Sequence, residues 1–269
     1  MQKEHQPYNI QPADRLANVS EYYFSRKLKE VAQMNAEGKN VISLGIGSPD
    51  MPPSEETVKC IVRTSKASWC ARIPTYCRHS WITQSHGRLV QALVSCRAWS
   101  GNRNPAAHRF QRRYPACDAG IGQSGWSVLV PNPGYPTYTS LNKILGSEIV
   151  NYNLREDNHW QPDFDELEKM DLSRVKIMWT NYPNMPTGAN ATMELYEKLV
   201  NFARRHNIVI VNDNPYSFIL NKKPLSILNV PGAKECCIEF NSMSKSTICP
   251  AGVWECSPPM RSLYNGYWK

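Results

Sequence analysis

The feature that most constrains the fold is a regular alternation of apolar runs and helical segments that begins at residue 127. Short runs rich in β-branched and aromatic residues predict strands at 127–131, 147–151, 174–180, 207–212 and 237–241. Segments of helical character lie between them near 136–145, 163–170 and 191–205. Strands that alternate with helices predict an α/β fold with a mostly parallel sheet. Ligands of such sheets bind where the strands end.

The N-terminal part is organised differently. Apolar residues at helical spacing predict a helix over 15–37, which Gly38 ends. The apolar run 41–44 then predicts a short strand. No apolar run reaches the 18 or more residues of a membrane span, and the first residues do not form a signal peptide. We therefore expect a cytoplasmic protein with no membrane partner.

Three chemically distinctive residues follow the last two predicted strands. Lys245 comes shortly after the strand at 237–241, and Asp213 and Tyr216 follow the strand at 207–212. Pyridoxal 5′-phosphate needs a lysine amine, an acid that keeps its ring nitrogen protonated and a phenol near its ring oxygen. The order and spacing of these residues favour such a site, although each alone is as well explained by a loop, a cap or a core position.

Two upstream loops carry further candidates. The strand at 127–131 ends in Pro131-Asn132-Pro133-Gly134-Tyr135, a turn that presents an aromatic ring. Tyr135 could stack on a cofactor ring or simply cover the core. The strand at 174–180 ends in Asn184-Met185-Pro186-Thr187-Gly188 before the helix at 191–205.

Together with the segment 42–50, which contains Gly45-Ile46-Gly47-Ser48-Pro49-Asp50, these motifs resemble class I/II aminotransferases of the aspartate aminotransferase fold, the fold type I pyridoxal phosphate enzymes. The similarity covers residues 1–59 and 127–246. It implies the large cofactor-binding domain of that fold, here incomplete, with an N-terminal helical segment. The resemblance divides the chain into three parts. Residues 1–50 form the N-terminal helix and entry loop, which belong to the small domain. Residues 51–246 form the large cofactor-binding domain, in which 60–126 are anomalous, and residues 247–269 form an anomalous tail.

The resemblance also implies roles. Lys245 would be the Schiff-base lysine, Asp213 would hold the pyridine nitrogen, Tyr216 and Asn184 would lie near the ring oxygen, and Tyr135 would stack on the ring. Ser242 would contact the phosphate, and the backbone near Gly47 would face the substrate carboxylate. The family has asparagine directly before Pro-Thr-Gly, where this chain has Met185. The implied activity is amino-group transfer between an amino acid and a 2-oxo acid, without a metal, and the intact family is expected to form homodimers.

Two stretches depart from this pattern, residues 60–126 and 247–269. The first has ten Lys or Arg but one acidic residue, and it holds five of the nine cysteines. Its cysteines and histidines match no metal-ligand spacing, and no helical or strand periodicity persists. In both stretches the residues can be encoded by synonymous codons that, read one base out of frame, give motifs of the family. We therefore predict that both are translated out of frame and that they are poorly ordered.

Other functions fit parts of the sequence. The same residues occur in fold type I lyases and decarboxylases, and fold alone does not separate these from aminotransferases. A truncated, catalytically inactive relative is a second alternative. A nucleic-acid-binding protein would use the basic stretch 60–126, but no recognition motif organises it. We therefore predict no nucleic-acid partner.

Overall fold

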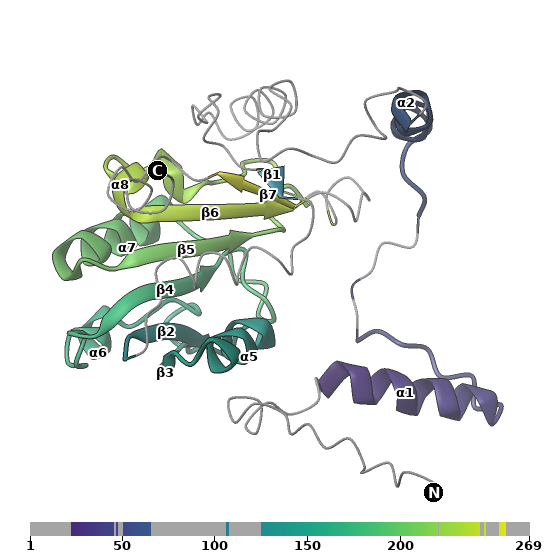
Figure 1. Cartoon of the computed structure of the whole chain (residues 1–269), viewed down its shortest axis with the longest axis horizontal. Helices are drawn as coiled ribbons and strands as arrows, with labels where there is room; N and C mark the ends of the chain where they lie inside the picture. The colour runs from purple at the N-terminus through teal and green to yellow at the C-terminus, as the bar shows by residue number, and fades with distance from the viewer. Residues whose placement is uncertain are drawn as a thin grey trace, which may run out of the picture.

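The computed structural model describes residues 23–45, 47, 51–65, 106–107, 125–219, 221–242, 245 and 253–256. A seven-stranded sheet forms its centre, in the order β1-β7-β6-β5-β4-β2-β3 (Figure 1). The strands are β1 (Ala106–Ala107), β2 (Ser127–Asn132), β3 (Glu148–Asn153), β4 (Val175–Asn181), β5 (Val209–Asn214), β6 (Cys237–Ser242) and β7 (Val253–Cys256). Strands β2 to β6 pair in parallel, whereas β7 is antiparallel to both β6 and β1. The predicted α/β fold with a mostly parallel sheet is confirmed.

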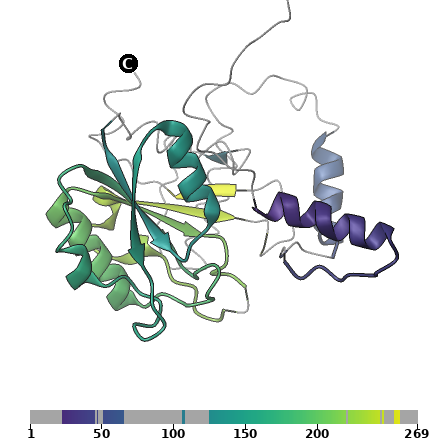
Figure 2. The same ribbon diagram turned by 90° about the horizontal axis from the view of Figure 1, so that it is seen from below.

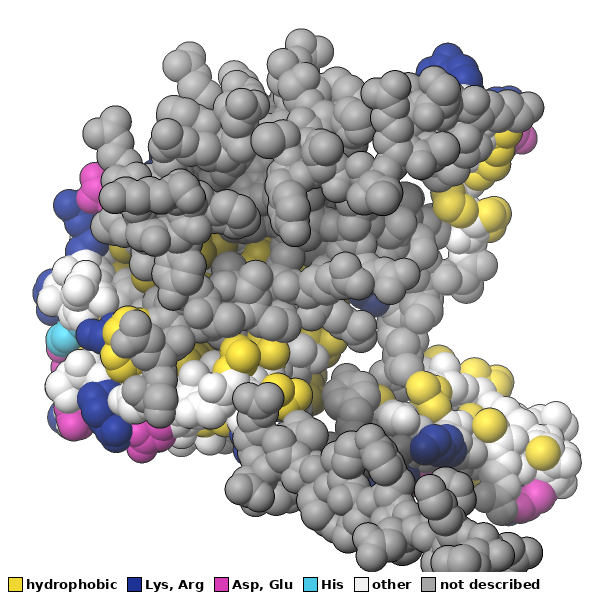
Figure 3. All heavy atoms as spheres, viewed as in Figure 1, with side chains coloured by type: hydrophobic (Ala, Val, Ile, Leu, Met, Phe, Trp, Pro, Cys, Tyr) yellow, Lys and Arg dark blue, Asp and Glu magenta, His cyan; other side chains and the backbone are white. Residues whose placement is uncertain are grey.

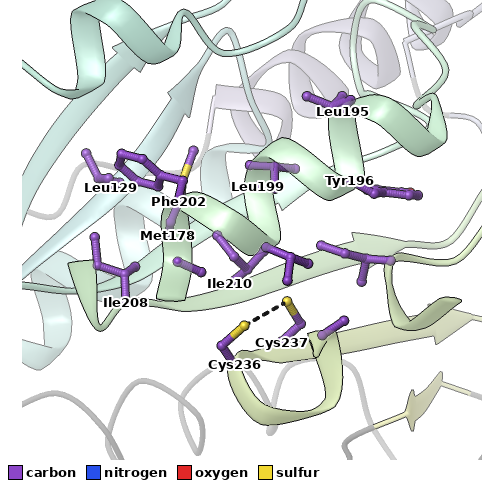
Figure 4. Packing of buried hydrophobic residues seen from close by; sticks show 14 of the residues in the cluster. Leu129, Met178, Leu195, Tyr196, Leu199, Phe202, Ile208, Ile210, Cys236 and Cys237 are labelled. Carbon is purple, nitrogen blue, oxygen red and sulfur yellow. Dashed lines mark hydrogen bonds between the residues drawn. The ribbon is translucent and has the colours of Figure 1, made fainter. Parts of the chain in front are cut away.

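Helices cover both faces of this sheet, as the view in Figure 2 shows. The helices on the sheet are α5 (Pro136–Leu145), α6 (Phe164–Leu167), α7 (Met193–His206) and α8 (Ala233–Cys236), with a 3₁₀ turn, η4 (Ile227–Asn229). Two further helices, α1 (Tyr23–Ala36) and α2 (Glu55–Ser65), precede them in the chain. Helix α7 packs on one face with Leu195, Leu199 and Phe202 (Figure 4). Helix α5 packs on the other face with Tyr138 and Leu141. Strands buried on both faces explain why the sequence shows continuous apolar runs rather than alternation.

Local signals set the ends of α7. The Thr192 hydroxyl accepts a hydrogen bond from the backbone N–H of Leu195 at 3.1 Å, which satisfies one N–H of the first turn. Asn207 ends the helix in the left-handed conformation, with φ of 53°, which asparagine tolerates better than most residues. The chain then enters β5, whose last residues carry the predicted site.

Several predicted boundaries need correction. Residues 41–44 form no strand, and Ile42 and Leu44 are 84% and 92% exposed. An apolar run becomes a strand only where a neighbour completes its hydrogen bonds, and the described residues place none beside it. The helix expected over 15–37 is described only as α1 from residue 23, because residues 1–22 lie outside the described part. The helix expected over 163–170 is the single turn α6.

The two stretches predicted to be poorly ordered contribute to three described elements, and their order stays a prediction. Helix α2 extends to residue 65, β1 lies at 106–107, and β7 adds a strand next to β6. The rest of 60–126 and 247–269 falls outside the described residues, except for Gly125 and Trp126, which lead into β2.

The N-terminal helices stand apart from the sheet. Both α1 and α2 lie beyond the carboxyl ends of the parallel strands in the two ribbon views (Figures 1 and 2). None of the described residues of α1 is buried, and apolar side chains are visible over both helices in Figure 3. Within the described ranges, no helix is both long and apolar enough to cross a membrane.

Candidate active site

Asp213 is the acidic residue at the carboxyl end of the central strands. It lies next to the end of β5, where its backbone pairs with Asn181 of β4 and Phe240 of β6. The side chain is 3% exposed. The Tyr138 hydroxyl donates a hydrogen bond to Asp213 Oδ2 at 2.7 Å. A buried carboxylate requires such donors, so α5 holds the acid in place.

Stacked aromatic rings support this contact. The Tyr138 ring lies 4.7 Å from the Trp179 ring, nearly parallel at 13°. Trp179 in turn stacks on Phe240 at 6.2 Å, and Tyr135 meets Tyr138 edge-on at 5.5 Å. The phenol that reaches Asp213 is therefore fixed by rings from β4, β6 and the turn after β2.

The phenols around Asp213 keep their protons. Burial raises the pKa of Tyr216, and the nearby charges of Asp213 and Tyr135 raise it further. Burial also raises the pKa of Tyr138 well above its ordinary value, with Asp213 as the next cause. Both hydroxyls consequently stay protonated at neutral pH, and that of Tyr138 donates to Asp213. Among the predicted residues, the structure thus brings Asp213, Tyr216 and Tyr135 together.

Lys245 and Gly47 also meet, although 198 positions separate them. The Lys245 ammonium donates a hydrogen bond to the backbone oxygen of Gly47. Lys245 follows β6, so it belongs to the same edge of the sheet as Asp213 on β5. Ser242 is the last residue of β6 and is 6% exposed. Because side chains alternate along a strand, Ser242 lies on the same face of the sheet as Phe240. Phe240 pairs with Asp213, so all three side chains lie on that face.

The loop after β4 is held by hydrogen bonds of its own asparagine side chains. The Asn184 amide nitrogen donates to the Asn181 backbone oxygen at 3.2 Å, and its oxygen accepts from the Thr187 hydroxyl at 2.7 Å. Both ends of the amide thus help to hold the shape of its own loop, and the predicted contact with a cofactor stays a prediction. The neighbouring Asn181 was not predicted. Its amide nitrogen donates to the Asp213 backbone oxygen and its oxygen accepts from the Met185 N–H, both at 2.7 Å.

A buried polar network supports the opposite face of the same strands. The Thr180 hydroxyl donates to the Asn212 side-chain oxygen, and the Asn212 amide donates to Glu239, both at 3.0 Å. Glu239 also accepts from the Ser226 hydroxyl and the Ile227 N–H. Burial raises the pKa of Glu239. Because Asn212 precedes Asp213, this network fixes the backbone from which Asp213 extends.

Sequence reasoning missed both Tyr138 and Glu239. The spacing of Tyr135 and Tyr138 in the first turn of a helix was the available signal for the first. For Glu239, the signal was an acid inside a strand predicted to be buried. Acidic residues are rarely buried unless they are paired, so such a residue predicts hydrogen-bond partners.

Comparison with known proteins assigns the class. The family described as aminotransferase class I and II matches residues 116–265. The LL-diaminopimelate aminotransferase of one Dehalococcoides mccartyi strain is 32% identical over 246 residues, covering 86% of this chain and 60% of the relative. That of Nitratidesulfovibrio vulgaris is 33% identical over 245 residues, covering 87% and 61%.

Solved structures of other proteins have the same fold. Apo-BacF from Bacillus subtilis superposes with a TM-score of 0.87 at 26% identity, covering 97% of this chain and 67% of that one. A probable N-succinyldiaminopimelate aminotransferase from Thermus thermophilus, at 24% identity and a TM-score of 0.80, covers 89% and 66% and supports the fold alone.

The chain belongs to the class I and II aminotransferase family. It spans about 60% of the length of the curated relatives that it matches. The family match includes 116–126 and 247–265, which are parts of both stretches predicted to be out of frame. Their out-of-frame origin stays a prediction.

Proposed function

We propose that this chain derives from an enzyme that transfers an amino group between an amino acid and a 2-oxo acid with pyridoxal 5′-phosphate. The observation that carries the proposal is the buried Asp213 carboxylate, held by Tyr138 at 2.7 Å at the end of β5. An acid fixed at this place, with a lysine after the next strand, is what the cofactor requires of its protein.

The residues present fit this cofactor. Asp213 would hold the ring nitrogen, Tyr216 would donate to the ring oxygen, Tyr135 would cover the ring, and Lys245 would carry the cofactor. Ser242 would contact its phosphate. When bound, pyridoxal phosphate supplies an electron sink for the α-carbon of the substrate. Asn184 would lie near the ring oxygen, and its amide also makes hydrogen bonds inside its own loop.

The chain's own groups would act as follows. The Tyr138 hydroxyl orients the Asp213 carboxylate, because it donates a hydrogen bond to one of the carboxylate oxygens. An ionised Asp213 can hold a proton on a neighbouring ring nitrogen. The Lys245 amine would move the proton of the substrate's α-carbon, and its bond to Gly47 keeps it at the strand end.

The relatives suggest a first substrate to test. Two similar proteins are named LL-diaminopimelate aminotransferases, so LL-diaminopimelate is our first choice of amino donor, tested with a panel of 2-oxo acids as acceptors. A lyase or decarboxylase would use the same residues, and an inactive relative would lack turnover. A homodimer is part of the proposal for the intact protein.

The test is binding of the cofactor at Lys245. Purified chain is mixed with pyridoxal phosphate, reduced with borohydride and digested with trypsin. Trypsin does not cleave after a modified lysine, so a cofactor on Lys245 joins residues 235–245 and 246–261 into one labelled peptide. Lys245→Ala should abolish both the label and the visible absorbance. The matched control is Lys198→Ala, which removes an exposed lysine of α7 that pairs with Glu194.

Activity is measured separately. The chain is expressed beside a version in which the codons for 60–126 and 247–269 are shifted back into frame. We expect transamination only in the restored version. Label on lysines other than Lys245, in either protein, would refute the site. Carbon dioxide or ammonia release without amino transfer would favour the decarboxylase or lyase.

A further inference from the structure

Two adjacent cysteines meet where α8 joins β6. Cys236 is the last residue of α8 and Cys237 is the first residue of β6. Their sulfur atoms lie 3.8 Å apart, joined by the dashed line in Figure 4. Cys236 is 8% exposed and Cys237 is fully buried. The pair lies at the end of β6 opposite to Lys245, so the proposed activity makes no use of it.

The two thiols have different surroundings. The pKa of Cys236 is lowered, chiefly by the hydrogen bond from Cys237, which outweighs the opposite effect of burial, and the positive charge of Arg204 lowers it further. The pKa of Cys237 is raised well above its ordinary value by its bond to Cys236 and by burial. The more accessible sulfur is therefore the better nucleophile, and the buried sulfur is positioned as its partner.

We propose that Cys236 and Cys237 form an oxidative modification site that reacts with peroxides and closes into a disulfide between adjacent residues. The Cys236 thiolate attacks a peroxide oxygen, the O–O bond breaks, and the departing oxygen leaves as water after taking a proton. Cys236 is then a sulfenic acid. The Cys237 sulfur attacks the Cys236 sulfur, the S–O bond breaks, and a second water leaves with the Cys237 proton. Two thiols lose two electrons, and one hydrogen peroxide becomes two waters.

Because both cysteines are buried, closure into a disulfide is favoured over modification by a large reagent, which the site has no room to hold. A disulfide adds no atoms to the packed layer between α7 and the sheet, and its second step uses a sulfur already in contact. The described residues contain no group of three side chains that could hold a metal ion, so the two sulfurs have no further ligand for metal binding there.

The bond should be easily reduced. Adjacent Cα atoms are about 3.8 Å apart, which is shorter than the usual separation of about 4.4–6.8 Å across a disulfide. Strain of this kind makes a disulfide labile. Closure would also move Cys237, which pairs with Ile210 at the start of β6. We therefore expect the oxidised chain to melt at a lower temperature than the reduced chain.

The positions of the lysines allow the oxidation state of the two cysteines to be measured on one peptide. Trypsin releases residues 235–245 as one peptide, which holds both cysteines and no other. Folded full-length chain is treated with increasing hydrogen peroxide, blocked with iodoacetamide and analysed by mass spectrometry. We expect this peptide to lose two hydrogens and to carry no alkyl group, and to become doubly alkylated again after dithiothreitol. Exposed Cys60, in the peptide 60–63, monitors the general reactivity of thiols.

The controls separate the two sulfurs. Cys237→Ser should leave a sulfenic acid on Cys236 that dimedone traps, and Cys236→Ala should leave Cys237 reduced. Wild-type chain unfolded in urea should close the bridge more slowly. The proposal is overturned if the folded wild type stays doubly alkylated at peroxide concentrations that oxidise Cys60, or if bridging is as fast in urea. It is also overturned if the two cysteines join other cysteines instead of each other.

Discussion

Replacing Tyr138 with phenylalanine tests the contact on which the candidate site depends. The change removes one hydroxyl, which donates to Asp213 at 2.7 Å. It keeps the ring, and so it keeps the stacking on Trp179 and the edge-on contact with Tyr135. Any loss of stability therefore reports the hydrogen bond and not the packing.

The size of the loss follows from charge and burial. A hydrogen bond to a charged group contributes about 1.5–3 kcal/mol, whereas one between neutral groups contributes about 0.5–1.5 kcal/mol. Tyr138 is fully buried and Asp213 is 3% exposed, so water does not replace the lost donor. We expect the free energy of unfolding to fall by about 1.5–3 kcal/mol, which is roughly a 10- to 150-fold change in the folding equilibrium.

Urea unfolding at neutral pH measures this change, and a double-mutant cycle isolates it. Tyr138→Phe, Asp213→Ala and the double variant should give a coupling energy of about 1.5–3 kcal/mol, because the two side chains interact directly. The matched control is Tyr196→Phe on the opposite face. Tyr196 is equally buried, but its hydroxyl only accepts a 3.5 Å contact from the neutral Asn212 amide. We expect that control to lose under about 1 kcal/mol.

The reasoning is refuted if the coupling energy is below about 0.5 kcal/mol, the range found for independent sites. It is equally refuted if the control loses as much stability as Tyr138→Phe. Either result would mean that the hydroxyl does not hold the Asp213 carboxylate.

Two other changes probe a strand and a helix that support the site. Glu239→Gln places an amide nitrogen among the donors Ser226, Asn212 and Ile227, so it should destabilise the fold by about 1–3 kcal/mol. Burial raises the pKa of Glu239 above its ordinary 4.5, so the wild type should lose stability as the pH rises from 4.5 through the raised pKa. Its advantage over Glu239→Gln in the free energy of unfolding should therefore shrink. Urea titrations at a series of pH values upward from 4.5 would contradict this if the difference between the two proteins stayed constant. Thr192→Ala removes the cap of α7 and should lower the free energy of unfolding by about 1 kcal/mol, whereas Thr192→Ser should preserve it; equal losses in both variants would exclude the cap as the cause.

Much of the fold was predictable because its signals are local. The apolar runs from residue 127 onward placed all five strands β2 to β6, and the helix at 191–205 matches α7 within a residue or two at each end. The same reasoning failed at 41–44, where an apolar run has no neighbouring strand in the described part of the chain. A strand depends on a partner that the run itself does not specify.

The candidate site was predictable in its members but not in its contacts. The order and spacing of Asp213, Tyr216, Tyr135 and Lys245 predict a common site, and ligands of parallel sheets bind where the strands end. Asn184 could not be judged, since the hydrogen bonds that hold its amide depend on how the loop closes.

By itself, the sequence determined the α/β class, the strands, the family and the residues at the strand ends. Only the tertiary structure decided which side chains meet. Tyr138 and Asp213 are 75 positions apart, and they touch because α5 packs over β5 on a face that depends on the order of the strands. Glu239 finds its donors on β5 and beside η4 in the same way. A local pattern fixes the type of each element, whereas the partners of a buried polar side chain follow from how distant elements pack together.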